Sequence, residues 1–284
     1  MRITISLAAI ALISASVCAH DFWIRPASFC PAPHSVLDVH LEVGHGGEFE
    51  RFARNPKRIA KFIIAGPGAN GPVRDIPGEP GAEPAGTVTL QATGVHVVGY
   101  RSNHAKSELP ADKFESYLAE EGLTGIITAR KEQGKSAEAG REVYSRCAKS
   151  LVRVGAPGDA PTASADAAGA SRHLGFTLEL VPVSDPTLAG TGDSVSFTLL
   201  FNGKPHPGTR VEFIQPHGHD HEHAKPHDHD RDHTAITDAQ GRVTFTIDEP
   251  GMWMAACVVM TPAASDSGAD WESWWASLTF EVAE

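Results

Sequence analysis

The amino-acid sequence predicts a mainly β protein built from two β-sandwich domains, the first of which carries a helical insertion. Short apolar segments recur along the chain, and glycine and proline, 27 and 20 of the 284 residues, punctuate them. A stretch rich in alanine, glycine, proline, aspartate and serine divides these segments into two groups. Short strands with turn residues between them are typical of sandwiches, and the biased stretch is typical of a linker.

Residues 1–19 have the features of a secretory signal peptide. The first two residues supply a positive charge, Ile3–Val17 is apolar, and Ala19 ends a small-residue cleavage pattern. Such a segment is removed on export and is too short to span a membrane. Cys18 leaves a lipid-attached alternative open, which the bulky residue before it does not favour. We therefore expect an exported mature chain that begins at His20.

The first domain is predicted over residues 20–154 and opens with strands. Leu37, Val39, Leu41 and Val43 alternate with polar residues, which indicates a strand with one buried face. The other predicted strands of this domain share apolar, β-branched or aromatic content; they are Phe22–Ile24, Ile59–Ile64, Thr87–Leu90 and Gly94–Tyr100.

A helical insertion is predicted at about 108–149. Pro110 lies in the first turn of the first helix, Phe114, Tyr117 and Leu118 share one face, and Gly122 ends it. A second helix is predicted over 136–149, because Val143, Cys147 and Leu151 recur every four residues with charged residues between them.

Residues 155–172 are the predicted linker, and residues 173–284 the second domain, an Ig-like or transthyretin-like sandwich. Asn202-Gly203 and Ala239-Gln240-Gly241 supply hairpin turns. The predicted strands are Leu174–Leu180, Ser194–Phe201, Thr209–Ile214, Arg242–Ile247, Met252–Met260 and Ser277–Val282.

Charge and composition exclude several classes of function. The formal net charge of −11 argues against a nucleic-acid partner, which would require a basic face. No later run reaches the 18 or so apolar residues that a membrane span needs, so no span is expected in the mature chain. The mature chain keeps Cys30, Cys147 and Cys257; export permits one disulfide, whose pairing the spacing leaves open, and no CxxC pair indicates a thiolate zinc site.

Histidine is the unusual residue of this sequence. Seven of the 15 histidines lie in the 17 residues from His217 to His233, in a polar segment with no apolar periodicity. Neutral imidazoles suit nickel, copper, zinc and related ions, so this exposed loop should capture metal weakly and without a fixed geometry. A merely charged polar loop is the alternative. The loop histidines are His217, His219, His221, His223, His227, His229 and His233.

A tighter metal site is predicted at the mature N-terminus. The α-amine and imidazole of His20 can chelate one ion, provided that the following strand docks on a core. His45, at a strand end, and His96, on a neighbouring strand, are the expected additional ligands, and Glu42 and Glu48 are carboxylates nearby. No nucleophile elbow, phosphate-binding loop or His-Glu-x-x-His motif is present in the sequence, so no catalytic residue is predicted.

Several segments resemble one known family of unknown function, which is often labelled as a soluble, NikM-like periplasmic component of cobalt or nickel ABC transport. The resemblance covers nearly the whole mature chain and implies periplasmic nickel or cobalt handling, with His20 at the family's N-terminal histidine. NikM itself is a membrane subunit, whereas this chain would bind and deliver an ion. The matching segments are Ala19–Ile24, Lys113–Leu123 and Arg141–Lys149, and then Gly203–Pro205, Thr237–Arg242 and Pro250–Trp253, which many transthyretin-like and Ig-like modules share.

The expected function is therefore capture of a divalent transition metal in the periplasm for uptake or homeostasis. Nickel or cobalt is expected, with copper or zinc possible on the same ligands, and a membrane metal transporter is the expected partner. Two alternatives remain open. One is a copper-dependent redox enzyme that uses the His20 chelate, and the other is a structural or protein-binding module of the cell envelope.

Overall fold

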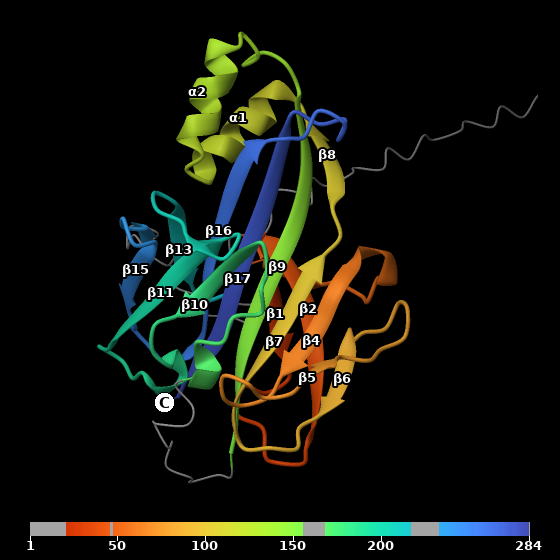
Figure 1. Cartoon of the computed structure of the whole chain (residues 1–284), viewed down its shortest axis with the longest axis vertical. Helices are drawn as coiled ribbons and strands as arrows, with labels where there is room; N and C mark the ends of the chain where they lie inside the picture. The colour runs from red at the N-terminus through yellow and green to blue at the C-terminus, as the bar shows by residue number, and fades with distance from the viewer. Residues whose placement is uncertain (1–20, 46–47, 156–167, 217–232, 284) are drawn as a thin grey trace, which may run out of the picture.

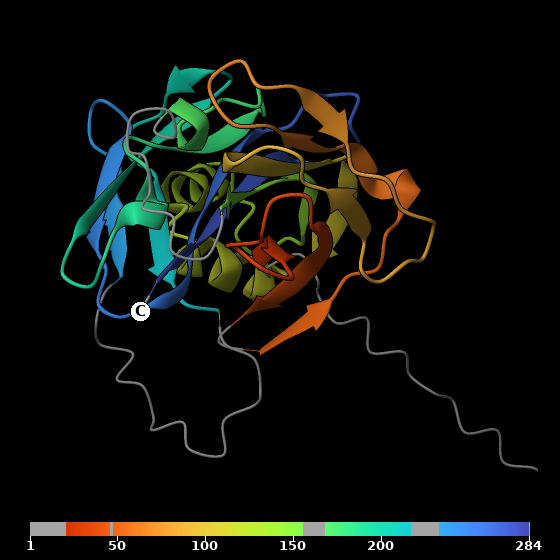
Figure 2. The same ribbon diagram turned by 90° about the horizontal axis from the view of Figure 1, so that it is seen from below.

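A computed structural model describes residues 21–45, 48–155, 168–216 and 233–283. The described chain is mainly β and sandwich-like, as the sequence predicts, with strands in three sheets and two α-helices at one end (Figure 1). Figure 2 looks along the long axis and shows the green-to-blue C-terminal part beside the red-to-orange N-terminal part.

The largest sheet has nine strands and runs through both predicted domains. Its centre is β9 (Gly140–Val154), which pairs with the antiparallel β7 (Gly94–Ser102) on one edge and with the parallel β17 (Trp271–Val282) on the other. The two halves are therefore joined by main-chain hydrogen bonds as well as by the linker. The remaining strands are β4 (Ile59–Ala65), β5 (Val73–Asp75), β8 (Ala105–Leu109), β13 (Arg210–Ile214), β14 (Thr234–Ile236) and β16 (Gly251–Pro262).

Two four-stranded sheets cover opposite faces of this central sheet. Cys147 and Leu151 of β9 belong to the core beneath one of them, and Ala148 and Val152 to the core beneath the other, as the alternation of a strand requires. The first covering sheet contains β10 (Leu178–Pro182), β11 (Ser194–Phe201), β12 (Lys204–Pro205) and β15 (Arg242–Thr246). The second contains β1 (Asp21–Pro26), β2 (Val36–His45), β3 (Glu48–Arg51) and β6 (Gly86–Thr89).

The helical insertion is shorter than predicted. The first predicted helix is confirmed as α1 (Ala111–Glu120), and α2 (Thr124–Glu132), which the sequence analysis missed, follows it. The helix predicted over 136–149 is wrong, because residues 140–149 belong to β9 and residues 136–139 form a turn before it. A spacing of four residues fits one face of a strand as well as one face of a helix, and the charged residues between belong to a strand that is buried on both faces.

Candidate functional site

Strand β1 begins at the second residue of the predicted mature chain and is fixed on both edges. One edge pairs with β2, from Asp21 opposite Gly44 to Pro26 opposite Val39. On the other edge the carbonyl oxygens of Phe22 and Ile24 accept hydrogen bonds from the Ser277 and Thr279 hydroxyls of β17, both at 2.7 Å. Phe22 and Ile24 are buried. The start of the described chain therefore has a fixed position in the fold.

A buried carboxylate joins Trp23 and Arg25 of β1 to β2. Oε2 of Glu42, which is fully buried, accepts hydrogen bonds from Trp23 Nε1 at 2.8 Å and Arg25 Nε at 2.7 Å. Arg25 also donates through Nη2 to the carbonyl oxygen of Pro216 at 3.0 Å. Pro216 is the last described residue before the histidine-rich segment, so β1 contacts the base of that segment.

One predicted ligand position, His45, lies at this end of the β1–β2 ladder, and another, His20, comes just before Asp21 in the sequence. His20 lies outside the described residues and is bonded to Asp21. His45 is the last residue of β2, one position beyond Gly44, which is the partner of Asp21. The register thus brings the position of His45 close to that of Asp21, the residue that follows His20 in the sequence. This proximity depends on the pairing of β1 with β2, which residue spacing alone does not specify.

His96 lies elsewhere on the central sheet. The ring of Phe22 packs on Tyr100 with centroids 5.0 Å apart, and β1 then runs across the sheet in the direction of His96. Asp21 and His96 are therefore on opposite sides of Phe22. His96 is buried, its Nδ1 lies 3.2 Å from the carbonyl oxygen of Gly94, and burial lowers its pKa. The structure does not bring His96 to the start of β1.

Only the last histidine of the predicted loop is among the described residues. His217, His219, His221, His223, His227 and His229 lie outside them. His233 precedes β14; its Nε2 is 3.4 Å from Asp248 Oδ2, and its ring packs edge-on against Trp253 at 5.7 Å. Within the described ranges, no group of three histidine, cysteine, aspartate or glutamate residues has an arrangement that could hold a metal ion.

The three cysteines of the predicted mature chain are free. Cys257 and Cys147 lie in one row across the sheet, with Ala276 of β17 between them, and Cys30 is exposed. Neighbouring strands are about 4.8 Å apart, so two strand spacings exceed the Cα separation that a disulfide permits. Burial raises the pKa of Cys147 to about 11, so this thiol stays protonated. The open question of pairing thus resolves to free thiols.

Acidic residues from three elements gather near the start of β1, and the sequence analysis missed them. Burial, and then the negative charges of Asp21 and Glu212, raise the pKa of Glu121 to about 8, while Arg210 acts in the opposite direction. Glu121 caps α1 and Glu212 belongs to β13, so these positions are remote in sequence. With a pKa of about 8, Glu121 is largely protonated at neutral pH, so the negative charge near the start of β1 comes from Asp21 and Glu212 and is partly offset by Arg210.

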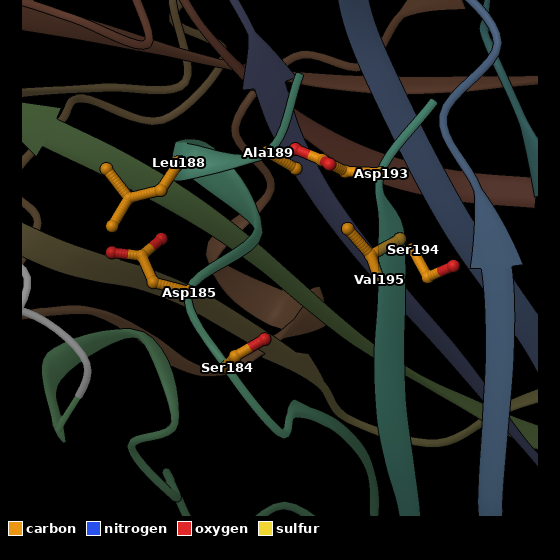
Figure 3. A pocket seen from close by; sticks show the side chains of 7 residues that line it. All are labelled: Ser184, Asp185, Leu188, Ala189, Asp193, Ser194 and Val195. Carbon is orange, nitrogen blue, oxygen red and sulfur yellow. The ribbon is translucent and has the colours of Figure 1, made fainter. Parts of the chain in front are cut away.

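A surface pocket of about 390 Å³ lies away from these residues, between the segments 184–189 and 193–195 (Figure 3). Both of its carboxylates have structural partners. Asp185 accepts hydrogen bonds from the Thr187 amide and from Arg153, and Asp193 accepts one from the Gly190 amide at 2.9 Å. The pocket therefore offers no free acid or base among its described side chains.

Comparison with models of protein families gives a match over most of the chain. The model of a family described as "Domain of unknown function (DUF4198)" matches residues 17–261. No curated protein matches. Among solved structures, the "D0-D1 domain of Intimin" is similar at 16% sequence identity and a TM-score of 0.20, over 92% of this chain and 97% of that chain. No helix in the described part of the chain is long and apolar enough to cross a membrane.

Proposed function

Since the chain belongs to the DUF4198 family, a domain of unknown function, we propose that it is a periplasmic protein that binds a divalent transition metal. The expected ion is nickel or cobalt, and the expected role is to capture it for uptake by a membrane transporter. The labels carried by the family that the sequence resembles support this choice of ion. Copper and zinc would bind the same nitrogen ligands, and copper would bind most tightly in vitro.

The anchoring of β1 is the observation that carries the proposal. A ladder that continued one step beyond Asp21 and Gly44 would bring His20 opposite His45. After cleavage, the α-amine and imidazole of His20 and the imidazole of His45 would supply three nitrogen ligands. The acidic surroundings of Glu121 favour a cation at this end of β1. We leave His96 out of the proposed site, because it lies on the other side of Phe22 from Asp21.

The histidine-rich segment is the proposed collecting surface for this site. Its base is hydrogen-bonded to Arg25, four residues along β1 from Asp21, which is about 13 Å of strand. The 16 residues from 217 to 232 can extend by ~3.3 Å each, so the segment is long enough to reach the start of β1. His233 lies 3.4 Å from Asp248 Oδ2, so this carboxylate would compete with a metal ion for it.

The test is a calorimetric titration of nickel, cobalt, copper and zinc into the mature protein with residues 217–232 deleted. We expect one tight site in the protein that begins at His20, and its loss when one extra residue precedes His20. His45→Ala should weaken this site, whereas His104→Ala, at an exposed histidine that pairs with Glu272, should leave it unchanged. Affinity should fall as pH drops from 8 to 5, because protons compete for the same nitrogens.

Two results would contradict the proposal. One is a shortened protein that binds no metal with either N-terminus, which would leave the histidine-rich segment as the metal-binding feature. The other is an affinity that does not change between pH 5 and 8. Oxygen consumption by the copper form that requires a reductant and His20 would instead favour the redox enzyme.

A further inference from the structure

Helix α1 covers a buried carboxyl group on the central sheet. Phe114, Tyr117 and Leu118 of the helix are buried against an aromatic surface of β9, β16 and β17 that includes Trp271 and Trp275. Glu142, the third residue of β9, lies in this interface and is 1% exposed. The metal site proposed above does not use this group.

One oxygen of Glu142 connects α1 to β17. Its Oε1 accepts a hydrogen bond from the Tyr117 hydroxyl at 3.3 Å and another from the Ser273 hydroxyl. Ser273 Oγ in turn accepts from Trp275 Nε1 at 3.2 Å, and the Trp275 ring stacks on Tyr117 with centroids 5.7 Å apart. The helix is therefore joined to the sheet through this carboxyl.

The other oxygen of Glu142 has no hydrogen-bond partner among the described residues. Trp271 Nε1 is also buried without a partner, and Trp271 is the register partner of Glu142 on β17. An ionised carboxylate would hold unsolvated charge on Oε2, which is costly in an apolar interface. A proton on Oε2 removes that charge and leaves both hydrogen bonds to Oε1 in place.

The groups that face Glu142 only partly offset this cost. From β9, Arg146 contributes a positive charge; α1 contributes Tyr117, and β17 contributes Ser273 and, through it, Trp275. β16 contributes the apolar Val258 and Met260, and β8 contributes the apolar Leu109 together with Ser107, the register partner of Glu142. The charged residues Lys106, Glu108 and Arg141 line a surface pocket with Glu142. Burial outweighs the polar groups and raises the pKa of Glu142 to about 7.

We propose that Glu142 is a proton-operated latch that holds α1 on the central sheet when neutral and loosens the helix when ionised. The helix is the element that can move away from Glu142. Around Glu142, β9 and β17 are held by main-chain hydrogen bonds to neighbouring strands, whereas α1 contacts Glu142 through the Tyr117 side chain. Loosening α1 would uncover the aromatic surface that includes Trp271 and Trp275.

The direction of the pH effect follows from proton linkage. In the closed state, with α1 docked on the sheet, the pKa of Glu142 is about 7. In the open state, with α1 loosened and Glu142 in water, its pKa would be the ~4.3 of a solvated glutamate. The contribution of the neutral group to closure is therefore complete below about pH 4.3 and is lost as pH rises through about 7. These two values predict an opening constant that increases about 30-fold between pH 5.5 and 8.5.

Hydrogen exchange of the metal-free mature protein tests the latch. After correction for intrinsic exchange rates, amides of α1 should exchange about 30-fold faster at pH 8.5 than at 5.5, relative to those of β16. Glu142→Gln keeps the shape and the acceptor without the charge and should exchange slowly at both values. Asp112→Asn, at an exposed position of the same helix, should keep the wild-type pH dependence.

A second variant separates the latch from a purely structural role. Ser273→Ala removes a hydrogen bond that favours the ionised carboxylate, so the midpoint of the pH transition should move to higher pH. A Glu142→Gln protein with the wild-type pH dependence, or a Ser273→Ala midpoint that does not move, would overturn the inference. Because no metal is present, neither result depends on the proposed metal site.

Discussion

At the scale of single residues, a buried ion pair joins β9 to the first covering sheet. Lys149 Nζ lies 2.9 Å from Glu179 Oε1 and also donates to the carbonyl oxygens of Leu180 and Arg172. The Glu179 carboxylate also accepts hydrogen bonds from main-chain amides, those of Leu174, Gly175 and Phe176. Both side chains are at most 2% exposed. Such a pair is tolerated because each charge is surrounded by hydrogen-bond partners.

Removing one member of this pair should be strongly destabilising. Lys149→Met leaves the carboxylate of Glu179 buried without its counter-charge, and we expect the free energy of unfolding to fall by about 3–5 kcal/mol. The double variant Lys149→Met, Glu179→Leu removes both charges and should recover part of the loss. Urea denaturation followed by circular dichroism measures both values. Equal stability of the single variant and the wild type would show that the pair contributes nothing.

Individual residues also show where sequence reasoning reached its limit. The charged residues Glu142, Arg146 and Lys149 are typical of an exposed helix face in the sequence, yet all three are buried. Each has a partner that lies far away in the chain or comes from another strand, such as Glu179 for Lys149 and Ser273 for Glu142. A local pattern cannot report such partners, so it could not distinguish this strand from a helix.

At the scale of elements, the start of β9 and helix α1 fit closely around a glycine. A Cβ atom added to Gly140 would lie 2.1 Å from Cγ of Phe114, which is fully buried under the helix. The sequence predicted α1 because its apolar face has the helical period and a proline and a glycine mark its ends. It missed α2, whose apolar face is weaker and whose residues apart from Arg130 are exposed or only partly buried.

Substitution at this glycine should loosen the docking of α1. Gly140→Ala forces the ring of Phe114 to move and should cost about 1–3 kcal/mol of stability. Gly125→Ala, in α2, is the matched control, because a Cβ there meets nothing within 4 Å; it should stabilise by about 0.5–1 kcal/mol. Thermal unfolding of both variants checks this. A Gly140→Ala protein as stable as the control would contradict the close fit.

At the scale of the whole molecule, the two halves share one sheet. The sequence predicts most of the strands correctly. It predicts two separate sandwiches because it carries no local signal for the parallel pairing of β9 with β17. The candidate site has the same limit. A strand at Phe22–Ile24 and a ligand at His45 could be predicted, but the ladder that brings Asp21 to Gly44 and leaves His96 on the far side of Phe22 required the structure.

The shared sheet predicts that neither half folds alone. In a protein of residues 168–284, the edge of β17 that pairs with β9 would be exposed. In a protein of residues 20–155, the edge of β9 that pairs with β17 would be exposed. We expect each fragment to aggregate or to lack a cooperative thermal transition, and the two to form one folded complex when co-expressed. Size-exclusion chromatography and circular dichroism distinguish these outcomes. Two fragments that each unfold cooperatively would show that the halves are independent.

The pairing of β9 with β17 can form only late in the synthesis of the chain. β9 ends at Val154, whereas its partner begins at Trp271 and is the last strand of the described chain. During synthesis the edge of β9 that receives β17 waits until the intervening residues have been made, and contacts between such distant segments form slowly. A ribosome that stops before Trp271 would release a chain with an open strand edge, which is a template for association with other chains.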